Sequence, residues 1–180
     1  MTNIALIGFM GTGKSSVGVR LAERLNWNFV DTDTRIEQKM GLCIPEIFHI
    51  YREEGFRLEE SLVIKEVAQF SNYVISTGGG IVLKEENIDN LKQSSVLICL
   101  RAKPEVILER IKTDGSRPLL KDENPLKMIK KLLELRAQNY SCADYDIDTS
   151  EKEVGCIVEE ILIYLKSRGI DHGKFSKGAN

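Results

Sequence analysis

Short apolar runs alternate with amphipathic segments along the chain. Runs bounded by turn residues predict five β-strands. These strands span Asn3–Gly8, Asn28–Asp31, Tyr73–Thr77, Ser95–Arg101 and Tyr145–Thr149. Segments with apolar residues at helical spacing predict helices over Lys14–Leu25, Asp33–Met40, Ile44–Phe70 with a break, Lys84–Leu91, Pro104–Lys112, Pro125–Tyr140 and Glu153–Ser167. Strands that alternate with helices predict an α/β fold, in which helices cover both faces of a parallel sheet.

One segment interrupts this alternation. Residues 112–124 combine Gly115, Pro118 and mixed charges with few apolar residues. A plain surface loop is the simplest interpretation, but long loops in compact domains often close over ligands. We therefore predict a mobile lid at about 112–124 within a single domain over 1–168. The polar stretch 169–180 is expected to be a frayed tail.

A phosphate-binding motif joins the first predicted strand to the first predicted helix. Residues 8–15 read GFMGTGKS, which fits the P-loop pattern G-x-x-x-x-G-K-[ST]. The glycines allow backbone N–H groups to converge on phosphate oxygens, and the helix start adds partial positive charge. We expect Lys14 to reach the β- and γ-phosphates and the Ser15 hydroxyl to ligate Mg²⁺. A glycine-rich turn that binds nothing is the alternative, and the strand–turn–helix setting argues against it.

Two predicted helices carry charged residues on their apolar faces. In the helix over 44–70, Glu60 falls on the apolar stripe, and Arg57 lies one helical turn before it. In the helix over 125–140, Arg136 extends the apolar stripe. A charge that faces a core needs a partner or a polar pocket, because an isolated buried charge is costly. A structural salt bridge is one explanation for Arg57 and Glu60, whereas a binding pocket is favoured for Arg136.

Two polar clusters follow predicted strands, where α/β sheets bind ligands. Asp31 and Asp33 close the second strand, so that one carboxylate could help hold Mg²⁺ through water and the other could accept a hydrogen bond from a substrate hydroxyl. A helix N-cap is the structural alternative for Asp33. The third predicted strand is followed by Gly78, Gly79 and Gly80. These glycines either let the backbone approach a ligand closely or form a tight turn.

Composition narrows the possible partners. The 180 residues are 42% hydrophobic and carry a net charge of −2, which gives no electrostatic indication of nucleic-acid or membrane binding. Apolar runs stay well below the roughly 20 residues of a membrane span, and the N-terminus does not resemble a signal peptide. The four cysteines are scattered, which favours reduced thiols in a cytoplasmic protein.

The motifs, in their order along the chain, resemble those of the shikimate kinases. The resemblance runs from GFMGTGKS through the DTD of 31–33, the FRxxE of 56–60, the GGG of 78–80 and the RPLL of 117–120 to Arg136, which is followed by Tyr140. It implies a three-layer α/β sandwich with a five-stranded parallel sheet in the order 2-3-1-4-5. It also implies a monomeric kinase that uses ATP and one Mg²⁺ per subunit. The implied reaction, a step of aromatic amino-acid biosynthesis, phosphorylates the 3-hydroxyl of shikimate and yields shikimate 3-phosphate and ADP.

The resemblance assigns roles on the acceptor side. Arg57 and Arg136 would grip the carboxylate of shikimate, a contact suited to planar guanidinium groups. Glu60 would hold Arg57 in position. Asp33 would orient or deprotonate the attacking hydroxyl, and Gly78, Gly79 and Gly80 would line the substrate with backbone.

On the nucleotide side, the resemblance implies that Lys14 and Arg117 neutralise charge on the transferring group and are catalytic together with Asp33. The implied ATP-binding residues are Gly11, Thr12, Gly13, Lys14, Ser15, Ser16, Arg110, Arg117 and Lys152. Ser15 would hold Mg²⁺ directly and Asp31 would hold it through water, with Ser76 assisting. Residues 149–154 depart from the basic, proline-containing stretch that the family often has there, and Lys152 takes the place of an arginine next to adenine.

Three alternatives have specific sequence requirements. A gluconate kinase of the same fold would not combine FRxxE, GGG and RPLL. A nucleotide switch of the GTPase type would need the guanine-specifying N-K-x-D, which the sequence lacks. A non-catalytic relative would have lost Lys14, Asp33 or a gripping arginine, and all of these are present.

Overall fold

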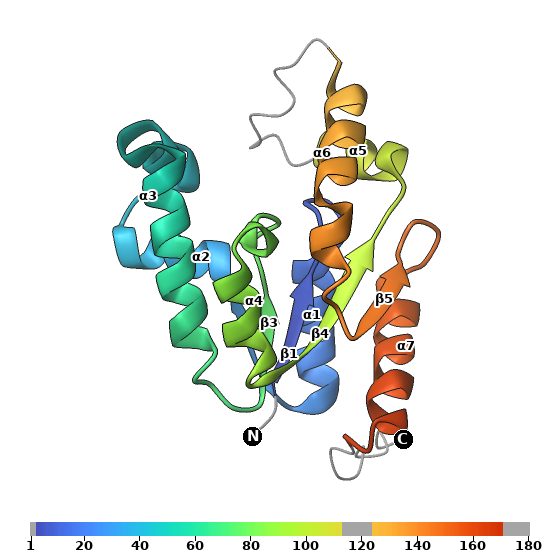
Figure 1. The fold of residues 1–180 in the computed structure, drawn as a ribbon. Coiled ribbons are helices and arrows are strands. Elements are labelled where there is room, and N and C mark those ends of the chain that lie inside the picture. Colours follow the sequence, from blue (N-terminus) through green and yellow to red (C-terminus); the bar gives the residue numbers. More distant parts are fainter. Residues whose placement is uncertain (1–2, 113–123, 171–180) are drawn as a thin grey trace.

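The computed structural model describes residues 3–112 and 124–170. Its centre is a five-stranded parallel sheet in the order β2-β3-β1-β4-β5 (Figure 1). The strands are β1 (Asn3–Ile7), β2 (Asn28–Asp31), β3 (Tyr73–Ser76), β4 (Ser95–Arg101) and β5 (Tyr145–Asp148). The helices are α1 (Lys14–Leu25), α2 (Thr32–Met40), α3 (Ile44–Val67), α4 (Glu85–Lys92), α5 (Pro104–Lys112), α6 (Pro125–Tyr140) and α7 (Val154–Ser167), with a short 3₁₀ helix η1 (Ile81–Leu83). The predicted α/β class and strand order are confirmed.

Alternate side chains of β1 bury into two separate cores. Ile4 and Leu6 pack with residues of α1 and α7 in one core. Ala5 and Ile7 pack with residues of α3, α4 and α6 in the other. This is the period of two expected of a strand covered on both faces. Figure 1 shows α1 and α7 on one side of the sheet, α4 beside β3, and α3 next to α4.

The start of α2 differs from the prediction. The helix begins at Thr32, and Asp31 is its N-cap, since Asp31 Oδ1 accepts hydrogen bonds from the backbone N–H groups of Asp33 and Thr34. The alternative in which Asp33 caps the helix is therefore wrong. A cap accepts from backbone N–H groups two or three residues ahead, and only Asp31 is placed to do so.

The break expected in the long third helix lies at Arg52. This residue has φ 59° and ψ −176°, a conformation outside the helical region that residues other than glycine rarely adopt. The helix axis changes direction there and the chain becomes helical again at Glu53. The second segment, which ends at Val67, carries Arg57 and Glu60 toward the sheet.

Some predicted features lie at or beyond the limits of the structure. The lid at 112–124 falls almost wholly outside the described residues, as does the tail from residue 171 onward. Over residues 3–112 and 124–170, none of the helices has the length and apolar composition needed to cross a bilayer. All four cysteines are free thiols, as expected.

Candidate active site

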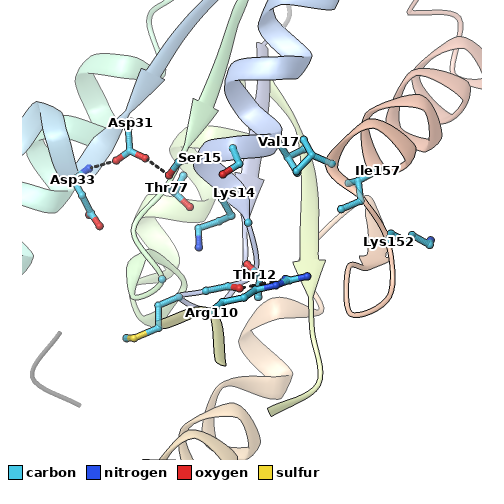
Figure 2. Close-up of a pocket in the computed structure, with 16 residues that line it drawn as sticks. Thr12, Lys14, Ser15, Val17, Asp31, Asp33, Thr77, Arg110, Lys152 and Ile157 are labelled. Atoms are coloured by element: carbon cyan, nitrogen blue, oxygen red, sulfur yellow. Dashed lines mark hydrogen bonds between the residues drawn. The ribbon is translucent and has the colours of Figure 1, made fainter. Parts of the chain in front are cut away.

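The phosphate-binding loop opens into a cavity of about 470 Å³ at the carboxyl end of the sheet. Its walls are Met10–Val17, Asp31, Asp33, Thr77, Gly79, Arg110, Lys152, Val154 and Ile157. Figure 2 shows Lys14 and Ser15 in the centre, with Asp31 and Asp33 on one side and Lys152 on the other. Since α1 begins within this wall, its N-terminal backbone presents partial positive charge to the cavity.

The loop backbone depends on glycine at its first position. Gly8 has φ 140°, and a Cβ at that position would lie 2.2 Å from the carbonyl oxygen of Leu100. Only glycine fits this conformation and this close approach to β4. The loop is thus fixed to the strand beside it.

Lys14 folds back over this loop. Its Nζ donates hydrogen bonds to the carbonyl oxygens of Gly8 and Phe9, each at 2.9 Å. The residue is buried, so its charge is held at the floor of the cavity. This position suits a cation that has to meet phosphate oxygens, as the motif predicts.

Oxygen donors gather at the ends of β2 and β3. Ser15 Oγ donates to Asp31 Oδ2 at 2.7 Å and lies 3.3 Å from the hydroxyl of Ser76. Asp31 therefore uses one carboxylate oxygen to cap α2 and the other to contact Ser15. The structure brings together the three residues expected to serve Mg²⁺.

Arg110 and Thr149 connect the phosphate-binding loop with the end of β5. The guanidinium of Arg110 donates to Thr149 Oγ1 at 3.0 Å and to the Thr149 carbonyl at 2.7 Å. Thr149 Oγ1 is also 3.0 Å from the carbonyl oxygens of Thr12 and Arg101. Thr149 is fully buried, so this polar junction is internal to the fold.

The glycine turn after β3 is held by α6. Tyr140 donates its hydroxyl to the carbonyl oxygen of Gly79 at 2.8 Å, and Arg136 donates to the same oxygen at 3.3 Å. Burial raises the pKa of Tyr140 to about 12, which keeps it a hydrogen-bond donor at neutral pH. The Arg136 guanidinium also lies over the ring of Phe9, 5.6 Å from its centroid. Arg136 thus faces the space between the glycine turn and the phosphate-binding loop.

Arg57 and Glu60 form the predicted ion pair in front of the same turn. Arg57 Nη1 donates to Glu60 Oε2 at 2.8 Å, and Glu60 is 1% exposed. Burial raises the pKa of the Glu60 carboxyl, and the positive charge of Arg57 opposes this shift. A Cβ on Gly80 would lie 2.2 Å from Arg57 Nη1, so the guanidinium rests directly on the glycine backbone.

Asp33 reaches the turn from α2. A Cβ on Gly78 would lie 2.6 Å from Asp33 Oδ1 and 3.0 Å from Glu60 Oε1, so both carboxylates flank Gly78. The Gly78 N–H donates to Thr32 Oγ1 at 3.0 Å. Asp33 also lines the cavity around Lys14, so it borders both halves of the site, the phosphate-binding cavity and the space around the glycine turn.

Comparisons with known proteins agree with this arrangement. The sequence profile of the family described as shikimate kinase matches residues 10–166. This chain belongs to the shikimate kinase family. It is 45% identical to the shikimate kinase of Caldanaerobacter subterraneus subsp. tengcongensis over 94% of this chain and 99% of that protein.

Solved structures separate the family from the wider fold. Shikimate kinase from Acinetobacter baumannii, in complex with shikimate, superposes with a TM-score of 0.89 at 38% identity, over 94% of this chain and 95% of that chain. A gluconokinase from Sinorhizobium meliloti gives a TM-score of 0.59 at 18% identity, over 93% of each chain. The second likeness shows a shared fold alone.

Most of the family's motif residues meet around the phosphate-binding cavity and the glycine turn beside it. Gly11, Thr12, Gly13, Ser15, Ser16 and Arg110 line the cavity with Lys14. Lys152 lies on its far wall and pairs with Glu160 at 2.5 Å. Arg117 lies outside the described residues.

Sequence reasoning missed several polar contacts that hold the site. The sequence predicted no side-chain contact for Thr149 and no role for Thr32 or Phe9. Their one shared signal is burial, since all three are at most 1% exposed. Burial of a threonine cannot be read from a single sequence, because the pattern does not show which hydroxyls find partners inside the fold.

Proposed function

We propose that this chain transfers the γ-phosphoryl group of ATP to the 3-hydroxyl of shikimate, giving shikimate 3-phosphate and ADP. The observation that carries the proposal is the position of Gly79. A Cβ on Gly79 would lie 3.2 Å from the backbone nitrogen of Met10 in the phosphate-binding loop. The carbonyl oxygen of Gly79 accepts hydrogen bonds from Arg136 and Tyr140. A phosphate site and an arginine-lined acceptor site therefore share one residue, as direct transfer between two bound substrates requires.

On the nucleotide side, the chain's own groups provide charge and orientation. The backbone of 11–16 and the start of α1 would bind the β- and γ-phosphates, and Lys14 would turn from its carbonyl partners toward them. Arg110 and Lys152, on the remaining cavity walls, would contact the adenosine part. Arg117 would add a second positive charge at the transferring group, as the RPLL motif of the family implies. These charges favour a transition state whose negative charge is spread over phosphoryl oxygens.

The residues near Ser15 fit Mg²⁺. A serine hydroxyl and a carboxylate 2.7 Å apart are oxygen ligands of the kind that Mg²⁺ prefers. Ser15 would bind the ion directly, and Asp31 and Ser76 would hold its water ligands. When bound, one Mg²⁺ would neutralise phosphate charge and orient the nucleotide.

On the acceptor side, Arg57 and Arg136 would bind the carboxylate of shikimate. Glu60 would hold Arg57 in place through their buried hydrogen bond. When Arg136 turns toward the ligand, Tyr140 would remain hydrogen-bonded to the carbonyl oxygen of Gly79. The backbone of Gly78–Gly80 would pack against the ring. Asp33 would accept the hydrogen of the attacking hydroxyl and hold its oxygen toward the phosphorus.

A coupled assay of ADP release tests this function. We expect turnover with shikimate, and none above background with gluconate or nucleoside monophosphates. Turnover with gluconate alone would make this chain a gluconate kinase. The active form is proposed to be monomeric, and four free thiols support a reducing compartment such as the cytoplasm. Sedimentation velocity tests the monomer.

A further inference from the structure

Arg57 contacts two carboxylates whose surroundings differ. Glu60 reaches Nη1 at 2.8 Å from inside the fold, and its side chain is 1% exposed. Glu53 reaches Nε at 3.4 Å and Nη2 at 3.2 Å from the surface, and its side chain is 68% exposed. The contact with Glu60 is short and buried, whereas the contact with Glu53 is long and solvated. Glu53 is therefore the partner that Arg57 can exchange at small cost.

Arg57 is shared by two carboxylates before a ligand arrives, and the positive charges of Lys84 and Arg136 also act on Glu60. One guanidinium faces two carboxylates, so this group of three side chains has a net charge of −1 when all are ionised. A carboxylate that approaches Arg57 is repelled by Glu53. It also competes for the Nε–Nη2 edge, which can bind a carboxylate through two parallel hydrogen bonds and which a single oxygen of Glu53 now occupies.

The backbone fixes Glu53 in this position. The chain leaves the helical conformation at Arg52 and becomes helical again at Glu53. Residues four apart on a helix are neighbours, so the restart places Glu53 beside Arg57. An acidic side chain is also favoured at the start of a helical segment. Phe56 helps to hold Arg57, since the Arg57 guanidinium lies 5.3 Å from the centroid of the Phe56 ring.

We propose that Glu53 is an internal competitor for the carboxylate of the substrate. It occupies Arg57 in the unliganded protein and is displaced when shikimate binds. This inference rests on the proposed function, because it takes Arg57 as a carboxylate-binding residue. Glu53 then lowers the affinity for shikimate and leaves the chemical step unchanged. A ligand without a carboxylate does not compete with Glu53 for Arg57, so Glu53 should leave the affinity for such a ligand unchanged.

Glu53→Gln tests the proposal, because the amide keeps the size of the side chain and removes its charge. We expect the Kd of shikimate, measured by calorimetric titration, to fall about two- to fivefold, the scale of an exposed ion pair. The KM for shikimate should fall in parallel, while kcat and the KM for ATP stay unchanged. A merely structural role for Glu53 would not improve the affinity for one substrate alone.

Two further variants make the result specific. Glu54→Gln removes the same charge from the exposed neighbouring residue and should leave the Kd of shikimate unchanged. In an Arg57→Ala background, Glu53→Gln should improve shikimate affinity less than in the unaltered protein, because the competition for Arg57 is gone and only the repulsion by Glu53 remains.

Each other outcome overturns the proposal. A higher Kd in Glu53→Gln would mean that Glu53 orients Arg57 for the substrate, and an unchanged Kd would mean that the contact is irrelevant to binding. An equal gain of shikimate affinity in Glu54→Gln would mean that the effect comes from the overall charge of the protein and not from the contact with Arg57. Failure of the proposed function would be seen separately, as a lack of shikimate turnover by the unaltered protein.

Discussion

Two glycines, one in each half of the site, make equally close approaches to very different neighbours. A Cβ on Gly8 would meet the backbone carbonyl of Leu100 at 2.2 Å, and a Cβ on Gly80 would meet the side-chain end of Arg57, also at 2.2 Å. The nucleotide half is thus built on backbone that cannot move without the sheet. The acceptor half is built on long side chains around a backbone turn. The first arrangement suits phosphate, which all nucleotides share, and the second suits recognition of one particular acid.

The largest effect, on the free energy of unfolding, should come from replacing one of these two glycines with alanine. Gly8→Ala adds a clash with backbone and a disfavoured φ of 140°, so we expect destabilisation of roughly 3 kcal/mol or more. Gly80→Ala displaces the flexible end of Arg57, including the Nη1 that pairs with buried Glu60, so its Tm should fall less than that of Gly8→Ala while the KM for shikimate rises. Thermal unfolding and steady-state kinetics measure both. Equal losses of Tm would remove the distinction between the halves.

Lys14→Met should lower turnover by roughly 10³-fold, since it removes a positive charge aimed at the transferring group. The lost hydrogen bonds to Gly8 and Phe9 leave two carbonyls beside an open cavity, where water can replace Nζ. Circular dichroism should therefore show a folded protein. Turnover within a few-fold of normal would mean that Lys14 only braces the loop.

Asp33→Asn should lower kcat by roughly 10²-fold and leave ATP affinity little changed, because an amide accepts the hydroxyl hydrogen poorly. The helix-cap explanation no longer competes, since Asp31 holds that role. Asp31→Asn is the matched control, because asparagine caps as well as aspartate does. It should change the Mg²⁺ dependence of the rate, and Asp33→Asn should not. Near-normal turnover in Asp33→Asn would return Asp33 to a structural role.

Arg136→Ala should weaken shikimate binding by roughly tenfold or more, the effect of one lost charge-assisted contact. ATP binding should change much less, because the Arg136 guanidinium contacts Gly79 and lies over Phe9, on the acceptor side of the loop. Calorimetric titration of each ligand decides this. Similar losses for both ligands would show that Arg136 mainly holds the glycine turn in place.

Local features of the fold and site could be predicted from the sequence, and contacts between distant segments could not. The alternation of apolar runs predicted the helices and strands, and helical spacing predicted that Arg57 reaches Glu60. The strand order came from the family resemblance. Gly79 and Arg136 are 57 positions apart, so their contact depends on how α6 packs beside η1, which no local pattern contains.

The break in α3 shows the same limit at the level of one residue. A break was expected, and Gly55 is the nearest glycine in the sequence, but the chain breaks at Arg52. Arginine has no preference for a positive φ, so packing of the two helical segments, rather than local propensity, sets the position. The alternative in which Asp33 caps α2 was wrong for a related reason, because two aspartates stand two residues apart and either could cap a helix.

The position of Gly79 has a thermodynamic consequence for the two substrates. Its Cα packs against the phosphate-binding loop, and its carbonyl is held by the residues that face the acceptor. If nucleotide binding shifts the loop, the free energy of placing Arg136 changes with it. By linkage, the factor by which ADP changes the affinity for shikimate equals the factor by which shikimate changes the affinity for ADP. Such a coupling would run through Gly79, which contacts both the phosphate-binding loop and Arg136.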